Sequence, residues 1–141
     1  MSGMYRNILE VNTNGEGEIV DLSRQVQDAV TASGIREGMV HVFVTGSTVA
    51  VTTIEYEKGV LKDLKRALSV LAPDAIPYAH DSAWGDGNGR SHVKASLVGP
   101  DLTIPVTSGE AMLGTWQQVV LLELDVRAQR TRTVVLTVSG E

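Results

Sequence analysis

The chain has 141 residues, a length that fits one domain and provides enough interior for a hydrophobic core. Hydrophobic residues make up 43% and charged residues 21%, as in an ordinary globular protein, and the net charge of −5 argues against a nucleic-acid-binding protein. The absence of cysteine excludes disulfides, thiolate metal sites and a cysteine nucleophile.

The N-terminal segment carries no targeting signal that can be recognised. MSGMYRNILEV lacks the long apolar stretch of a signal peptide, and no run in the chain reaches the roughly 20 apolar residues of a membrane span. We therefore expect a cytoplasmic protein with no membrane partner.

The first third of the chain predicts two short strands and one helix. The strands are expected over 5–11 and 18–20, separated by the turn-rich segment NTNGEG. Apolar residues at helical spacing predict an amphipathic helix over 21–34. Asp21 is the expected N-cap, and Gly34 suits the position after the last turn.

The next segment predicts a strand pair and a second helix. Residues 39–56 alternate and are rich in β-branched side chains, so they are expected to form two strands joined by a tight turn at TGST (45–48). The alternation places His41 on the mixed face of the first strand. An apolar stripe predicts a helix over 60–71, which Pro73 ends.

The remainder of the chain is predicted to be mostly β-structure. The run VVLLEL (119–124) is apolar on both sides, so its strand is expected to lie between two layers or in a subunit interface. The irregular order of helices and strands favours an α+β fold with layered, largely antiparallel, sandwich-like β-sheets and two helices packed on one side. The candidate strands are 92–98, 102–106, 113–124 and 131–138.

Residues 80–92, HDSAWGDGNGRSH, form the segment with the highest density of potential ligands. Imidazole nitrogen together with carboxylate oxygen suits zinc or a neighbouring divalent metal, so His80, His92 and Asp86 are the expected metal ligands, with magnesium as the alternative ion. The alternating glycines let backbone N–H groups form an anion-binding concavity, which Asn88 would complete. The competing interpretation is an ordinary loop, because Asn88-Gly89 alone makes a type I′ turn.

Three well-known ligand-binding loop motifs do not fit this segment. In an EF-hand alignment, Trp84 would take the first ligand position and Ala95 would take the position of the bidentate glutamate. The glycine spacing differs from that of a dinucleotide-binding turn, and the G-K-[ST] sequence of a phosphate-binding P-loop is absent.

Further candidates lie outside the loop. Glu55 and His41 could transfer protons, as could Asp86 within the loop. Ser47 and Thr48 in the TGST turn provide a second anion cradle or only a hairpin turn. Trp116 could form the wall of a pocket, although a core position is the commoner role for tryptophan.

Several stretches in this order resemble the YjbQ family, also called UPF0047, some members of which are labelled secondary thiamine-phosphate synthase. The resemblance covers residue 5 to the C-terminus and predicts one YjbQ-like domain over 1–141. The stretches that carry it are TGSTVAVTTIEYEKGVLKDL, YAHDSAWGDGNGRSHVKASLVGP, LTIPV, LGTWQQVVLLELD and VVLTVSGE.

The resemblance implies a compact homotrimer with a polar pocket near the subunit boundary. It also implies a small-molecule enzyme that acts on a phosphorylated or anionic metabolite with a divalent metal, with a thiamine-phosphate synthase-like reaction as the specific form that the family label suggests. A non-catalytic trimeric module that binds a metal or an anion is the alternative. The pocket positions that match the family are His80, Asp86, Asn88, His92, Ser47, Thr48, Thr115, Trp116 and Gln117, with Glu55 in the place of an amide.

Overall fold

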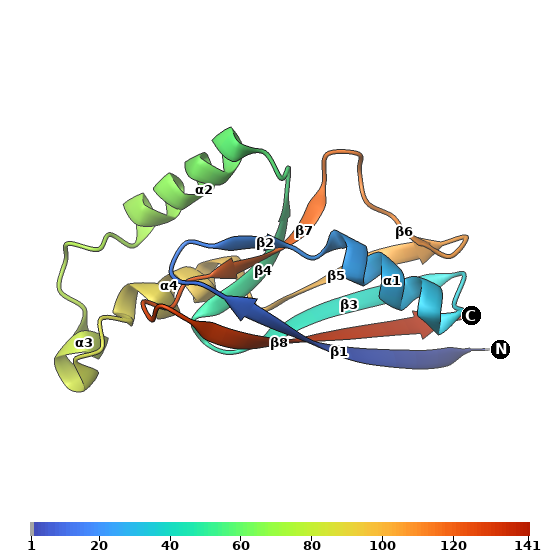
Figure 1. Ribbon diagram of the computed structural model, residues 1–141, viewed down its shortest axis with the longest axis horizontal. Helices are drawn as coiled ribbons and strands as arrows, with labels where there is room; N and C mark the ends of the chain where they lie inside the picture. Colours follow the sequence, from blue (N-terminus) through green and yellow to red (C-terminus); the bar gives the residue numbers. More distant parts are fainter. Residues whose placement is uncertain (1) are drawn as a thin grey trace.

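The computed structural model describes residues 2–141 and contains two antiparallel sheets (Figure 1). The larger sheet has five strands in the order β1-β8-β3-β5-β6, and every pairing in it is antiparallel. The smaller sheet has three strands in the order β2-β7-β4, also antiparallel. The strands are β1 (Gly3–Thr13), β2 (Ile19–Asp21), β3 (Gly38–Thr45), β4 (Val49–Ile54), β5 (Asp101–Thr107), β6 (Glu110–Ala111), β7 (Gln118–Glu123) and β8 (Arg130–Gly140).

Strand β7 lies between two packed layers, as its two-sided apolar sequence predicts. Val119 and Leu121 join the larger core cluster, together with residues of the five-stranded sheet. Val120 and Leu122 face the opposite way and pack in the second cluster with Leu68 of helix α2 (Lys58–Leu71). The expected α+β fold with layered, largely antiparallel sheets is therefore confirmed.

Four helices complete the described chain: α1 (Ser23–Ser33), α2, α3 (Ala79–Trp84) and α4 (Gly89–Val98). The expected two helices on one side are therefore wrong, because α1 packs in the larger core cluster whereas α2 packs in the second one. Helix α1 occupies the predicted place, and Gly34 ends it in the left-handed conformation with φ of 70°. The helix begins at Ser23, so its N-cap is Leu22 and not Asp21 as predicted. The Asp21 carboxylate nevertheless accepts a hydrogen bond from the Ser23 amide at 2.9 Å. None of the helices in residues 2–141 has the length and apolar character needed to cross a membrane.

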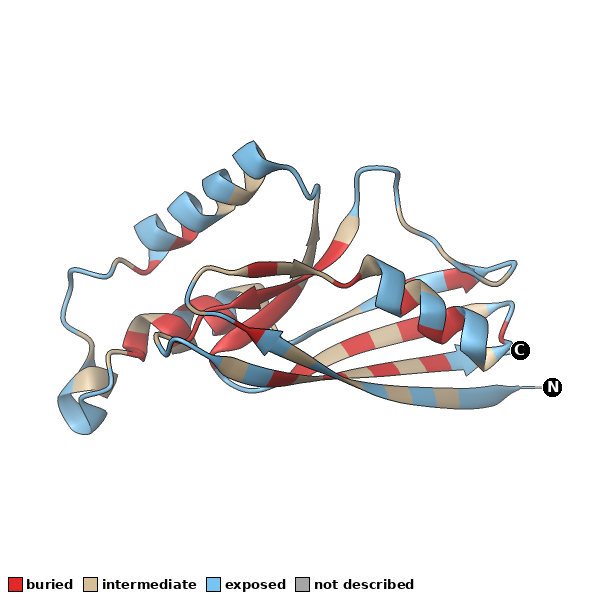
Figure 2. Cartoon of the chain, in the orientation of Figure 1, coloured by how far each residue is buried: buried red, intermediate tan, exposed pale blue. Residues whose placement is uncertain are grey.

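Helix α2 lies over the three-stranded sheet with most of its surface exposed (Figures 1 and 2). Leu68 is its buried residue, and Leu61 and Leu64 pack partly against the second core cluster. The side chain of Glu57 caps the helix by accepting hydrogen bonds from the Gly59 and Val60 amides. Part of the apolar stripe predicted from the sequence therefore contacts the sheet, whereas Leu71 at its end is 65% exposed.

The predicted hairpin over 39–56 is wrong, although both of its strands exist. Strand β3 already pairs with β8 on one side and with β5 on the other, so it has no free edge for β4. The chain instead crosses at Gly46, which has φ of 131°, to the smaller sheet, where β4 pairs with β7.

The segment 92–98, predicted as a strand, is part of helix α4. The buried residues of this helix include Ser91, Lys94 and Ala95, whereas Val93 and Leu97 are exposed, so its buried face carries little of the hydrophobic signal. Residues 113–117, predicted as the beginning of a strand, form an irregular segment and a turn before β7.

We expect Gly140→Ala to lower the free energy of unfolding by about 2 kcal/mol, measured by urea denaturation. Gly140 has φ of 143°, and a Cβ there would lie 2.1 Å from the backbone oxygen of Glu37. Neither atom can move without separating β3 from β8. Gly3→Ala is the control: no atom lies within 4 Å of its added Cβ, so a change within about 0.5 kcal/mol is expected. Equal effects of the two substitutions would contradict the close approach.

Candidate functional site

The two histidines of the 80–92 segment lie side by side. His80 belongs to α3, and His92 is the fourth residue of α4. The centroids of the two rings are 4.6 Å apart, with an interplanar angle of 52°. The segment is therefore two short helices joined by a turn, not the loop that was predicted. Gly85 and Gly87 take left-handed φ values of 71° and 74° in the turn, as the glycine-rich sequence predicts.

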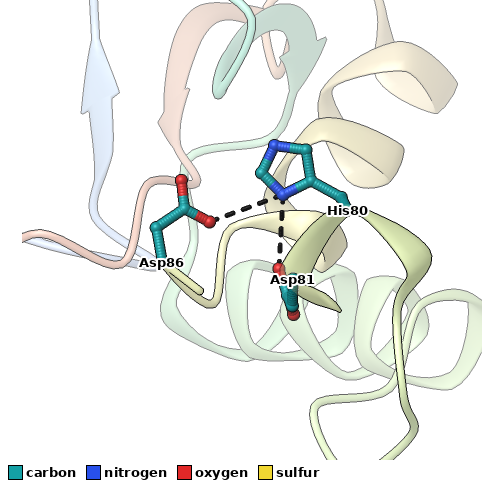
Figure 3. A group of neighbouring side chains, drawn as sticks. All are labelled: His80, Asp81 and Asp86. Carbon is teal, nitrogen blue, oxygen red and sulfur yellow. Dashed lines mark hydrogen bonds and ion pairs between the residues drawn. The ribbon is translucent and has the colours of Figure 1, made fainter. Parts of the chain in front are cut away.

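His80 also faces two carboxylates (Figure 3). Its Nδ1 atom is 3.3 Å from Oδ1 of Asp81 and 3.4 Å from Oδ1 of Asp86. One ligand atom from each of these three residues lies within 4.8 Å of the other two. Strong hydrogen bonds between an imidazolium and a carboxylate are shorter, about 2.7–2.9 Å. Two ligands bound at about 2.1 Å to one tetrahedral ion, in contrast, lie about 3.4 Å apart. The His80–Asp81 contact is a hydrogen bond, and the same spacing would also suit two ligands of one ion.

The hydrogen bond of His92 fixes the tautomer of its ring. Nδ1 of His92 is 3.1 Å from the backbone oxygen of Ser47. A carbonyl oxygen can only accept, so Nδ1 carries the proton in this bond. In the neutral ring Nε2 then presents a lone pair, which is the arrangement found in metal-ligating histidines whose other nitrogen donates to a carbonyl. His92 is thus prepared to act as a ligand.

Backbone amides orient both carboxylates. The Gly89 amide donates to Oδ1 of Asp81 at 2.8 Å, and the Asn88 amide donates to Oδ1 of Asp86 at 3.0 Å. Gly89 can do this because it has no side chain: a Cβ there would lie 2.5 Å from Cβ of Tyr78. The turn between α3 and α4 therefore holds the carboxylates toward His80.

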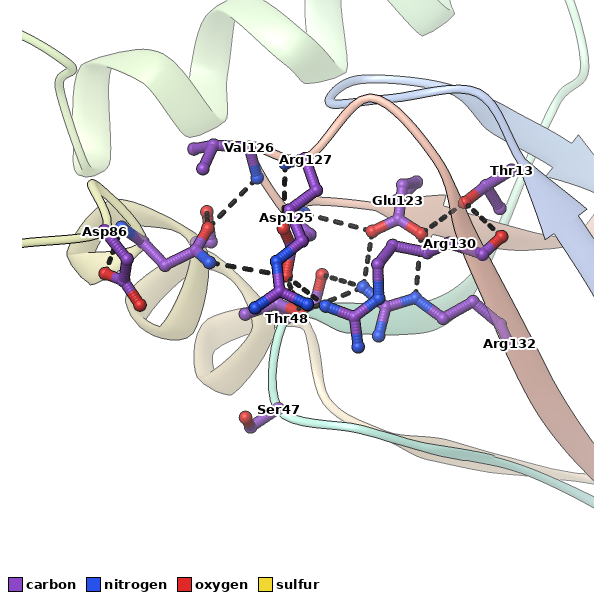
Figure 4. Close-up of polar contacts among 12 residues, drawn as sticks. Thr13, Ser47, Thr48, Asp86, Glu123, Asp125, Val126, Arg127, Arg130 and Arg132 are labelled. Atoms are coloured by element: carbon purple, nitrogen blue, oxygen red, sulfur yellow. Dashed lines mark hydrogen bonds and ion pairs between the residues drawn. The ribbon is translucent and has the colours of Figure 1, made fainter. Parts of the chain in front are cut away.

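A buried polar network lies next to this cluster (Figure 4). The buried Asn88 side chain donates to Asp125 at 3.3 Å, and Thr48 donates to the same carboxylate at 2.9 Å. Arg132 donates to Thr48 at 2.9 Å and to Glu123 at 2.7 Å. These contacts tie the start of α4 to strands β7 and β8, so the network holds the helix that carries His92.

Both carboxyl groups of the network have lowered pKa values. Burial alone would raise the pKa of Glu123, but hydrogen bonds from Arg132, Thr13 and the Asp125 amide hold it below 4.5. Burial would likewise raise the pKa of Asp125, but the Arg127 amide, the Thr48 hydroxyl and the charge of Arg130 hold it below 3.8. Both groups are therefore charged at neutral pH.

We expect the melting temperature to fall as the pH drops below about 4.5. A carboxylate whose pKa is lower in the folded chain stabilises the fold above its unfolded pKa, and this contribution disappears as the pH falls toward the folded value. Thermal unfolding followed by circular dichroism between about pH 7 and pH 3 measures the effect. Asp125→Asn removes one of the two groups, so its acid dependence should be shallower. An unchanged slope would contradict the role of Asp125.

The other predicted site residues lie in two different places. His41 is on the outward face of β3, where Nε2 pairs with Asp101 at 2.7 Å. Glu55 follows β4, whereas Thr48 precedes it, so the strand's six residues place the two roughly 20 Å apart. Within one chain, neither His41 nor Glu55 joins the histidine pair.

The LGTWQ segment lies near Glu55, at the far end of β4. Gln117 donates from Nε2 to Thr53 at 3.2 Å, and Thr115 and Trp116 form the turn before β7. Trp116 is 73% exposed, so the expected core position is wrong. Ser47 is exposed and contributes its backbone oxygen to His92, while Thr48 directs its hydroxyl into the buried network.

Sequence reasoning missed four polar residues of the site. Asp81 is adjacent to His80 in HDSAW, and the carboxylate content of the whole segment was the available signal. Glu123 and Asp125 interrupt the apolar run VVLLELD, and charged residues in a buried strand indicate a paired network. Arg132 occupies the same face of β8 as the buried Val134 and Leu136, which is a similar signal.

Layered antiparallel sheets, with a histidine and carboxylate cluster where two short helices meet, define an α+β protein with a candidate metal centre. The chain belongs to the family described as UPF0047 protein YjbQ-like, which matches residues 7–141. The expected family membership is thereby confirmed.

Relatives and solved structures agree with this assignment. A UPF0047 protein of Methanothermobacter thermautotrophicus is 34% identical over 98% of this chain and 94% of its own length. One of Archaeoglobus fulgidus is 37% identical, covering 91% of this chain and 96% of its own. The crystal structure of a YbjQ-like protein of unknown function from Sulfolobus solfataricus has a TM-score of 0.88 at 28% identity, with 99% of this chain and 100% of that chain covered.

Proposed function

We propose that the chain binds a divalent metal ion between α3 and α4 and acts there on a small phosphorylated or anionic metabolite. The observation that carries the proposal is the convergence of His80, Asp81 and Asp86 on one point of the surface, with the ring of His92 4.6 Å from that of His80. Two imidazoles with carboxylate oxygens suit zinc, whereas magnesium prefers oxygen ligands alone. Asp81 is added here to the ligand set that the sequence predicted.

Each residue has a defined part in this proposal. His80, Asp81, Asp86 and Nε2 of His92 would hold the ion, which would polarise a phosphoryl or carboxyl oxygen of the substrate. The Asp86 side chain is 44% exposed and has a second oxygen directed away from His80, so it is the group placed to exchange a proton with the substrate or with water. Ser47, next to His92, lies where a substrate anion would approach.

The finer part of the proposal is a thiamine-phosphate synthase-like reaction. Joining a pyrimidine diphosphate to a thiazole phosphate needs a divalent cation and phosphate-binding groups. The proposed metal site would provide the first of these. The resemblance to the family supports this particular reaction, whereas the chemistry of the proposed site supports the wider class of phosphorylated metabolites.

The test is a turnover assay with untagged, zinc-loaded protein. The panel contains phosphorylated metabolites and the two thiamine-phosphate precursors. We expect turnover by the wild-type chain and its loss in His92→Ala, with His41→Ala unaffected if one chain forms the site. Absence of turnover across the panel with fully loaded protein would reject the enzymatic proposal.

A non-catalytic binding module is the second candidate. It is favoured by the openness of the cluster, because the side chains of His80 and Asp86 are 32% and 44% exposed and water reaches them. This candidate predicts a ligand that co-purifies unchanged and raises the melting temperature. Chemical conversion of that ligand by the protein would reject the binding module and favour the enzyme.

We also propose that the chain forms a homotrimer. Met4, Ile8 and Met39 are 64%, 60% and 54% exposed on β1 and β3, which flank β8 in the five-stranded sheet, and they offer an apolar surface that a second copy would cover. In such an assembly, Glu55 and Trp116 of one chain could approach the histidine pair of another. Light scattering during size-exclusion chromatography would give three times the chain mass of 15.1 kDa, and a monomer would reject this proposal.

A further inference from the structure

A lysine on the other side of α4 is buried without a close partner. The Lys94 side chain is 7% exposed, and within residues 2–141 the carboxylate nearest its ammonium group is that of Asp74, at 3.9 Å. This separation exceeds hydrogen-bond length. Burying an ammonium group is costly unless its donors are satisfied. No fully enclosed side-chain nitrogen in residues 2–141 lacks a hydrogen-bond partner, so the ammonium group of Lys94 retains contact with solvent, and its donors are open to a ligand that enters from there.

The ammonium group of Lys94 lines a cavity between α2, α4 and the turn before β2. The cavity has a volume of about 230 Å³, and Lys65 and Ser69 of α2 also line it. Leu68 and Leu124 form its apolar part. Since a water molecule occupies about 30 Å³ of liquid, the space accommodates a phosphate or carboxylate group with a few waters.

The acidic residues of this cavity are already neutralised. Arg90 donates to both carboxylate oxygens of Glu16, at 2.8 and 2.9 Å, and its Nε lies 3.1 Å from Asp74. The residues that line the cavity carry two positive charges, Lys65 and Lys94, and two negative charges, Glu16 and Asp74. Because Arg90 pairs with both carboxylates from beside the cavity, no carboxylate of residues 2–141 lies closer than 3.9 Å to the ammonium groups of Lys65 and Lys94, and these donors are left for an anion.

We propose that this cavity is an oxyanion-binding site in which Lys94 is the central donor. The ligand is the phosphate or carboxylate group of a small molecule, with Lys65 and the Ser69 hydroxyl as additional donors. The site is separate from the histidine cluster, because positions 92 and 94 point about 200° apart around a helix. It therefore does not depend on the proposed metal centre.

The test is an NMR titration of ¹⁵N-labelled protein with inorganic phosphate and, in a second arm, with acetate. We expect saturable shifts of the Gly17 and Ser69 amides with at least one of the two anions, and the stronger response identifies the ligand group. Lys94→Met should weaken this binding by about tenfold or more, since a charge-assisted hydrogen bond is lost. Lys62→Met removes an exposed lysine of α2 outside the cavity and should leave the binding unchanged.

Two results would overturn the proposal. One is the absence of saturable shifts at Gly17 and Ser69 with both anions. The other is equal weakening by Lys94→Met and Lys62→Met, which would show a non-specific charge effect. Should Lys94→Met fail to fold, Lys65→Met replaces it in the comparison, and the titration of the wild-type chain still decides whether the cavity binds an anion.

Discussion

Arg132→Met is expected to lower the free energy of unfolding by about 3–5 kcal/mol, because it leaves the buried Glu123 carboxylate without its cation. The Arg132 and Glu123 side chains are 2% and 0% exposed, and no solvent can replace the lost hydrogen bonds. Thr48 would also lose a donor. Urea denaturation at neutral pH measures the loss, since Glu123 is then fully charged.

Two control variants distinguish the effect of breaking this buried ion pair from the effect of removing any charged residue. Arg130→Met removes a cation that is 30% exposed, so its effect should be much smaller. The double variant Glu123→Leu/Arg132→Met leaves no unpaired charge and should recover most of the lost stability. A double variant as unstable as Arg132→Met alone would show that packing, and not the unpaired carboxylate, is responsible.

His92→Ala is expected to weaken zinc binding on the order of a hundredfold. Four-ligand zinc sites gain about 10–16 kcal/mol on binding, which is roughly 3 kcal/mol for each ligand. His80→Ala should have a similar effect. Competition with a chromogenic chelator measures the affinity, and circular dichroism confirms that each variant keeps the helical signal of α4.

His41→Ala is the matched control for these variants. His41 pairs with Asp101 on the five-stranded sheet, outside the histidine cluster, so its removal should leave the zinc affinity unchanged within about twofold. A loss in His41→Ala comparable to that in His92→Ala would place the metal elsewhere or between subunits.

The buried network and the histidine cluster form one structural unit through Asn88. The Asn88 amide orients Asp86, while the side chain accepts from the Val126 amide and the Ser91 hydroxyl, both at 3.0 Å. The position of α4, and of His92 on it, therefore depends on a side chain anchored between β7 and β8. Substitutions in the network should consequently change the metal affinity as well as the stability.

Long segments with one clear periodicity could be predicted from the sequence. The alternation of β3 and β8 specifies a single burial pattern, and the structure agrees with it. The apolar stripe predicted the position of α2, although Leu71 at its end is exposed. The two-sided apolar run of β7 likewise predicted a strand between layers. In these elements the buried face is hydrophobic, so sequence and packing carry the same information.

The helices of the site could not be predicted in the same way. Helix α3 has six residues, which is too short for a periodicity to emerge. In α4 the buried residues include Gly89, Ser91 and Lys94, whereas Val93 and Leu97 are 42% and 57% exposed. A small and polar buried face with apolar exposed residues reverses the usual pattern, and it produced the wrong strand prediction.

The two histidines were predicted correctly to lie together with Asp86, but Asp81 was missed. The density of ionisable groups in 80–92 indicated a common site, whereas the role of Asp81 depends on the tight contact of α3 with α4 at Gly89. Glu55 and Trp116 were grouped with the histidines although β4 separates them in one chain. Such separations depend on strand order, which the sequence does not reveal.

X-ray absorption at the zinc edge tests the central claim most directly, with untagged protein loaded with one equivalent of zinc. We predict a first shell of nitrogen and oxygen at about 2.0–2.1 Å, with the outer-shell scattering of two imidazoles in the wild-type chain and of one in His80→Ala. A spectrum without imidazole scattering, or one that is the same in both proteins, would contradict a metal centre between α3 and α4.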